Sequence, residues 1–140
     1  MKIAISYPPI LNDHGQKAMV SQNRNVQFFK EPTYLLPVTY AQAATYLDEM
    51  GYEVYWDDGN AQLKTFDEWL EDLVNEVPDV IVLESTTPVM KFYWNIVNKI
   101  KSDLPHCTVI MTGYHSMRKP EETLRSSSTD VVLRSNHIDF

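Results

Sequence analysis

Two short segments combine residue types that could hold a ligand. Residues 84–87 (Glu-Ser-Thr-Thr) place a carboxylate and three hydroxyls in four consecutive positions. Residues 113–115 (Gly-Tyr-His) begin with a glycine, which allows close backbone approach or a positive φ. A large ligand lying on the edge of a sheet would need such a backbone conformation or close approach. Each hydroxyl alone could cap a helix or close a turn, so the joint placement is more informative than any single residue.

Both segments follow predicted strands. Residues 79–84 and 107–111 are apolar runs rich in β-branched side chains, typical of parallel strands buried on both faces. Three further strands are predicted at residues 2–6, 52–57 and 130–133. The 52–57 strand alternates polar and apolar residues, which favours a position towards a sheet edge.

Helical patterns alternate with these strands. The predicted helices run from Pro37 to about Met50, from the Thr65-x-x-Glu68 capping box to near Pro78, through Tyr93 to Ile100, and from Pro120. The order β-α-β-α-β-α-β-α-β indicates an α/β fold with a mostly parallel sheet. Five strands favour a flavodoxin-like, or Rossmann-like, three-layer sandwich with strand order 2-1-3-4-5. Such a sheet usually carries one more helix after the fifth strand, so we expect a fragment of a longer chain.

Ligands of open parallel sheets bind outside the carboxyl ends of the strands. Four segments are expected to meet there: residues 7–37, 84–89, 113–119 and 134–137. Residues 10–36 are polar and are predicted to be irregular, and a long irregular loop is usually functional.

Composition and missing motifs exclude several functions. The chain has 140 residues and a net charge of −7, which disfavours nucleic-acid binding. Its single cysteine, Cys107, cannot form a disulfide framework or an iron–sulfur ligand set. No apolar run approaches the roughly 18 residues of a membrane span, so a cytoplasmic domain is expected.

Dinucleotide, P-loop and nucleophile-elbow motifs are absent. Asp57 and Asp58 are expected to be solvated loop acids.

The sequence also resembles a known family. Residues 82–88 (Val-Leu-Glu-Ser-Thr-Thr-Pro) resemble the "(I/L)-E-(S/T)-(S/T)-T-P" segment of cobalamin-binding domains in B12-dependent radical SAM proteins. The likeness is greatest to the branch around the anaerobic magnesium-protoporphyrin IX monomethyl ester oxidative cyclase. Residues 112–115 and 119–124 resemble its "G-x-H…P-E-E-x-L", and residues 7–9 (Tyr-Pro-Pro) its first strand ending.

The resemblance implies a domain that holds cobalamin, with the corrin across the strand ends and the nucleotide tail between the first and third strands. The implied cofactor-binding residues are Tyr7, Pro8, Glu84, Ser85, Thr86, Thr87, Gly113, Tyr114, His115, Arg134 and Ser135. The domain alone would not be an enzyme. A downstream radical SAM domain with S-adenosylmethionine and a [4Fe-4S] cluster would make the parent protein one, of methyltransferase or oxidative cyclase type.

Some alternatives remain open. Asp13-His14-Gly15 lacks the D-x-H-x-x-G spacing, so His14 is expected to be a solvated histidine and not a cobalt ligand. Phe28, Phe29 and Tyr34 could shield a bound corrin or pack the long loop onto the sheet.

Arg134-Ser135 stands where the family has Gly-Glu, which favours an alternative function: an interaction or regulatory module that has lost its cofactor. A stand-alone enzyme acting on a nucleotide or sugar has no catalytic constellation to support it.

Overall fold

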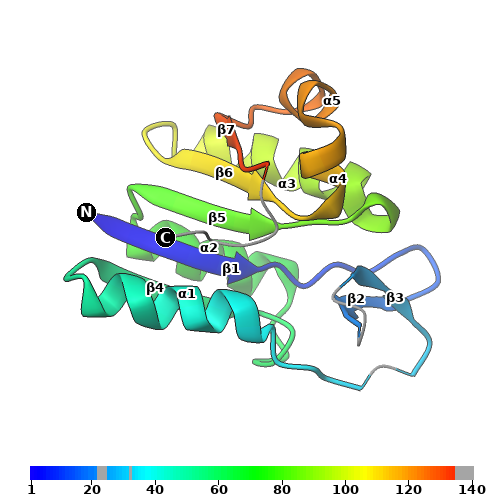
Figure 1. Cartoon of the computed structure of the whole chain (residues 1–140). Coiled ribbons are helices and arrows are strands. Elements are labelled where there is room, and N and C mark those ends of the chain that lie inside the picture. Colours follow the sequence, from blue (N-terminus) through cyan, green and yellow to red (C-terminus); the bar gives the residue numbers. More distant parts are fainter. Residues whose placement is uncertain (22–24, 32, 135–140) are drawn as a thin grey trace.

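A computed structural model describes residues 1–21, 25–31 and 33–134 of the chain. Five strands form one parallel sheet: β1 (Lys2–Tyr7), β4 (Glu53–Asp58), β5 (Val80–Glu84), β6 (Thr108–Thr112) and β7 (Val131–Val132). They correspond to the five predicted strands, and their order across the sheet is β4-β1-β5-β6-β7 (Figure 1). The protein is therefore an α/β protein with a parallel sheet, consistent with a flavodoxin-like fold.

The helices lie on both faces of this sheet (Figure 1). On one face, α1 (Val38–Glu49) packs Tyr40, Ala43 and Ala44 against the β1 side chains Ile3 and Ile5. On the other face lie α2 (Phe66–Glu76) and α3 (Met90–Asp103). These two helices bury a larger core, whose bulkiest fully buried members include Trp69, Tyr93, Leu73, Ile81, Leu83, Ile100 and Met111. Alternation along each strand separates the two cores.

Local sequence signals explain where the helices start and stop. The predicted capping box of α2 is confirmed: the Glu68 amide donates to Thr65 Oγ1 at 3.3 Å, and the Thr65 amide donates to Glu68 Oε2 at 2.8 Å. At the end of α1, Gly51 takes a φ of 87°, which suits glycine. The predicted helix at Pro120 is confirmed as α5 (Pro120–Ser126). Among the described residues, no helix is long and apolar enough to cross a membrane.

The prediction that residues 10–36 are irregular is wrong in part. Two strands, β2 (Lys17–Val20) and β3 (Val26–Phe29), pair antiparallel and form a hairpin beside the carboxyl ends of the sheet (Figure 1). Four-residue strands give too little periodicity to stand out from the polar residues around them. Two short helices were also not expected, η1 (Thr87–Val89) and α4 (Tyr114–Arg118), and they follow β5 and β6 directly.

Candidate functional site

A cavity of about 300 Å³ opens at the carboxyl edge of the sheet, on the face covered by α1. Its lining includes Val20 and Ser21 at the end of β2, residues 35–40 at the start of α1, and Glu84 at the end of β5. The cavity lies near β1 and β5. After β1 the chain continues to β4 on one side of the sheet, and after β5 it continues to β6 on the other side. The cavity therefore lies at the switch point, where open parallel sheets bind ligands.

Buried tyrosines form polar contacts beside this cavity. The Tyr7 hydroxyl donates to Glu84 Oε2 at 2.5 Å, and both side chains are buried. Burial first, and the Glu84 carboxylate second, raise the pKa of Tyr7 well above its usual value. Next to it, the hydroxyls of Tyr40 and Thr112 lie 3.0 Å apart. The Tyr7 phenol thus stays protonated and keeps the Glu84 carboxylate at the cavity wall.

The hydroxyls after Glu84 are used inside the protein. Ser85 is fully buried, and its Oγ lies 3.1 Å from Met90 Sδ and 3.5 Å from Ser116 Oγ. The Thr86 hydroxyl donates to the Val26 carbonyl and so joins the hairpin to the end of β5. Only Thr87 is exposed in this segment. The structure brings the predicted hydroxyls together, but all three already have partners, because Thr87 Oγ1 lies 3.2 Å from His115 Nδ1.

Gly113 has the positive φ expected of it, 94°. A Cβ built on Gly113 would lie 2.1 Å from the Ser85 carbonyl oxygen and 2.9 Å from the Ser85 amide nitrogen. The space left by the missing side chain is therefore filled by the backbone that follows β5. This contact joins the ends of β5 and β6.

His115 is buried in α4, with 5% of its surface exposed, while the neighbouring Tyr114 is exposed. Its Nδ1 lies 3.2 Å from Thr87 Oγ1, whereas its Nε2 is buried and has no hydrogen-bond partner among the described residues. The Glu122 carboxylate lies 3.9 Å from Nε2. Burial lowers the pKa of His115, and Glu122 only partly opposes this effect. The ring is therefore neutral near pH 7.

The prediction that Asp57 and Asp58 are solvated is wrong: they are 0% and 3% exposed. Asp57 accepts from Lys64 Nζ at 2.8 Å and from Ser6 Oγ at 3.3 Å. Asp58 accepts from the Tyr34 hydroxyl at 2.7 Å and from two amides of the following turn. A carboxylate that binds amides two and three residues later is typical of a turn, so the sequence held a signal for Asp58. No local pattern indicates the partners of Asp57.

The remaining predicted residues are dispersed. Pro8 is buried after β1, and Arg134 is exposed after β7. Ser135 lies outside the described residues. His14 is exposed in the loop before β2, as expected for a solvated histidine. Phe28 packs on Phe92 with ring centroids 5.4 Å apart, so its ring holds the hairpin on α3.

Comparisons with known proteins supply no family for this chain. No protein-family model matches the sequence, and no curated protein matches it significantly. Within the part of the chain that the structure describes, no three or more His, Cys, Asp or Glu side chains form a group that could hold a metal ion.

Proposed function

We propose that this domain binds a cobalamin at the carboxyl edge of its sheet, with the nucleotide tail entering the cavity beside Glu84. The observation that carries the proposal is the cavity itself, at the switch point between β1 and β5. Its volume of about 300 Å³ is at the small end of ligand pockets, so it would take one part of a large cofactor. The corrin would lie outside it, over the strand ends.

The groups around the cavity suit the tail of such a cofactor. Glu84 would accept hydrogen bonds from its hydroxyl or amide groups. The first turn of α1 follows Pro37 and has no side-chain cap. Its Val38 and Tyr40 amides donate to the carbonyls of Leu36 and Pro37, so the Thr39 amide would be the one to bind a phosphate. The exposed side chains Thr87, Tyr114 and Arg134 would contact the outer part of the cofactor. Ser85, Thr86 and Gly113 would support the site and not contact the cofactor, because they are used internally.

A bound cobalamin supplies alkyl-transfer or radical chemistry at its cobalt, which no side chain can replace. In this proposal the domain holds and orients the cofactor. A radical SAM domain of the same protein would cover the corrin and bind S-adenosylmethionine and the [4Fe-4S] cluster. No protein ligand to cobalt is proposed, because Asp13-His14-Gly15 lacks the D-x-H-x-x-G spacing.

Retention of hydroxocobalamin after desalting tests the proposal through the visible absorbance of the corrin. Thr39→Trp places a bulky ring at the cavity wall in the first turn of α1. Thr45→Trp is the matched control, because Thr45 is exposed on the same helix and does not line the cavity. We expect the wild type and Thr45→Trp to retain the chromophore and Thr39→Trp to lose at least about tenfold in affinity. Absence of retention by the wild type, or equal retention by both variants, would contradict the proposal.

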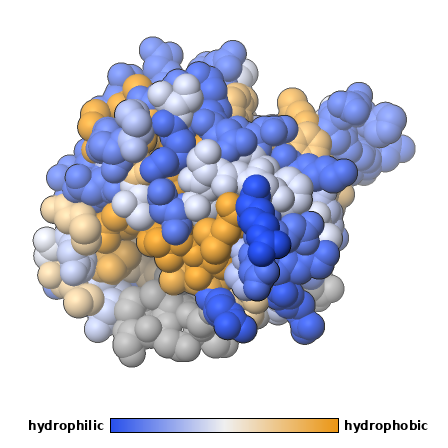
Figure 2. Space-filling model, turned by 90° about the horizontal axis from the view of Figure 1, so that it is seen from above, coloured by the Kyte–Doolittle hydropathy of each residue, from blue (hydrophilic) through white to orange (hydrophobic). Residues whose placement is uncertain are grey.

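A second function, a protein-interaction module without a cofactor, is favoured by the surface. Figure 2 shows hydrophobic residues gathered in the middle of the face seen from above, with hydrophilic residues beside them. The elements at this end of the sheet carry exposed apolar side chains, Leu124 on α5 and Val131 on the edge strand β7. Exposed apolar patches can mark interaction sites. If hydroxocobalamin does not bind, this function becomes the leading one.

A further inference from the structure

A second cavity lies on the opposite side of the sheet from the one beside Glu84. Its volume is about 520 Å³, and it is enclosed by the segment after β1, the start of β2, the β4–α2 loop, and the helices α2 and α3. Neither the resemblance nor the proposed function uses it. The two cavities share no lining residue, so each can be tested without the other.

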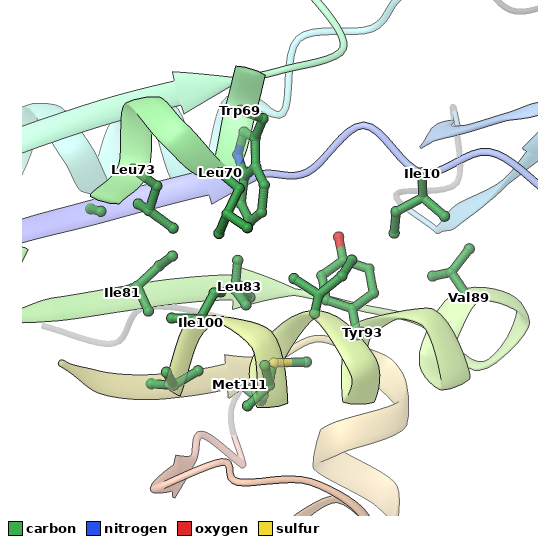
Figure 3. Packing of buried hydrophobic residues seen from close by; sticks show 14 of the residues in the cluster. Ile10, Trp69, Leu70, Leu73, Ile81, Leu83, Val89, Tyr93, Ile100 and Met111 are labelled. Atoms are coloured by element: carbon green, nitrogen blue, oxygen red, sulfur yellow. The ribbon is translucent and has the colours of Figure 1, made fainter. Parts of the chain in front are cut away.

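The walls of this cavity are largely apolar, and several of their side chains pack on residues behind them. Ile10 lies at its inner side and points toward Val89 and Tyr93 of the main core (Figure 3). The Phe66 ring packs on Trp69 at 5.5 Å between centroids, and the Phe92 ring packs on Phe28 at 5.4 Å. Two phenyl rings fixed by further rings form a preformed aromatic surface, which favours planar apolar ligands.

One rim residue has an unfavourable backbone conformation and an exposed apolar side chain. Leu63 lines the cavity with 77% of its surface exposed, and its φ is 57°. A bulky non-glycine residue rarely takes this left-handed conformation. The conformation places an apolar side chain at the cavity entrance, although neither burial nor local geometry favours it.

Within the described residues, two polar groups of the cavity lack a partner. Asn60 lines it, and its Oδ1 is buried without a hydrogen-bond partner among the described residues. Lys17 also lines it and forms no salt bridge within the described part of the chain. The other lysine of the wall, Lys64, is neutralised by Asp57 and Asp72, each at 2.8 Å. A ligand with a negative charge would pair with Lys17, and a ligand donor would reach Asn60 Oδ1 once the Asn60 side chain turns toward the cavity.

We infer that this cavity binds a small aromatic carboxylate that also carries an N–H or O–H donor. The aromatic body lies between Phe66 and Phe92, the carboxylate pairs with Lys17, and the donor satisfies Asn60 Oδ1. Charge-assisted pairing of a carboxylate with an ammonium is strong where surrounding apolar groups exclude water. An unpaired lysine beside an apolar wall favours an anionic ligand over a neutral one of the same shape.

Calorimetric titration with indole-3-acetate tests the inference, because this probe has an aromatic body, an N–H donor and a carboxylate. Indole-3-acetamide has the same shape without the charge, and 1-naphthylacetate keeps the charge without the donor. We expect the wild type to bind indole-3-acetate about tenfold more tightly than either analogue. Lys17→Gln should abolish the preference for acid over amide. Lys91→Gln, a matched loss of one exposed lysine away from the cavity, should preserve it.

Asn95→Trp provides a second variant that does not depend on charge. Asn95 is exposed on α3 and lines the cavity, so the bulky ring should block the site without disturbing the core. We expect binding of all three probes to fall at least tenfold in this variant and to be unchanged in Thr39→Trp. No binding of indole-3-acetate by the wild type at millimolar concentration, equal binding of acid and amide, or normal binding by Asn95→Trp would each overturn the inference. None of these results depends on whether cobalamin binds.

Discussion

Gly113 and Ser85 touch through their backbones: a Cβ on Gly113 would lie 2.1 Å from the Ser85 carbonyl oxygen. The Ser85 amide in turn donates to the Thr112 carbonyl at 2.9 Å. The ends of β5 and β6 are therefore joined by a contact that leaves no room for a methyl group. The edge of the sheet that faces the candidate site depends on this contact for its shape.

Gly113→Ala should lower the free energy of unfolding by about 3 kcal/mol or more, through left-handed strain and the clash with Ser85. Gly15→Ala is the control, because Gly15 also has a positive φ of 70° but a Cβ there meets nothing within 4 Å. It should cost only about 1 kcal/mol. Urea unfolding followed by circular dichroism measures both. Equal losses in the two variants would show that the Ser85 contact is unimportant.

Alkaline pH should destabilise the protein through its buried phenols. Burial and the Glu84 carboxylate raise the pKa values of Tyr7 and Tyr93 above those in the unfolded chain. A raised folded-state pKa gives stability that is present below about pH 10 and is lost as the pH rises further. Tyr7→Phe should therefore flatten the loss of stability between pH 9 and 11, while Tyr114→Phe, an exposed control, should leave it unchanged. A wild-type stability that is constant over this range would contradict the prediction.

Acidic pH should destabilise the protein through His115, because burial lowers the pKa of this histidine. Glu122 favours its protonation and Lys119 opposes it. A histidine with a lowered folded-state pKa gives stability that is present above its unfolded value of about 6.5 and is lost as the pH falls below it. We expect stability to fall between pH 7 and 5 by up to about 1.4 kcal/mol per unit from this group. His115→Gln should remove this part of the slope, and His14→Gln, at an exposed site, should not.

Lys64→Met should leave the Asp57 carboxylate buried without its cation. A loss of about 3 kcal/mol is expected at pH 7. Burial already raises the pKa of Asp57, and Lys64 partly opposes this, so the variant should raise it further. The loss should therefore be smaller at pH 5, where the carboxyl group is more often protonated. Thermal unfolding of Lys64→Met and of the double variant Lys64→Met/Asp57→Asn measures the effect. The double variant should be the more stable of the two, because it no longer buries an unpaired carboxylate. A double variant no more stable than Lys64→Met would refute the prediction.

The sequence by itself determined the local elements and the sheet they build. Apolar runs at residues 79–84 and 107–111, the Thr65–Glu68 capping box and the prolines before the helices each depend on neighbours close in the chain. Those signals act over a few residues, so they indicated the five strands of the sheet and the helices α1, α2, α3 and α5, but not η1 and α4. The same signals were too short to reveal the four-residue strands of the hairpin.

The tertiary structure decided which of the candidate side chains are used inside the protein and which stay exposed. Ser85 and Thr86 find partners at Ser116 and Val26, about 30 and 60 positions away in the chain. Asp57, which was expected in solvent, is buried because Lys64 and Ser6 meet it there. Such pairings follow from the packing of distant segments and leave no periodic pattern in the sequence. A residue type at a strand end therefore indicates where a site can form, while long-range packing decides which groups remain free to bind.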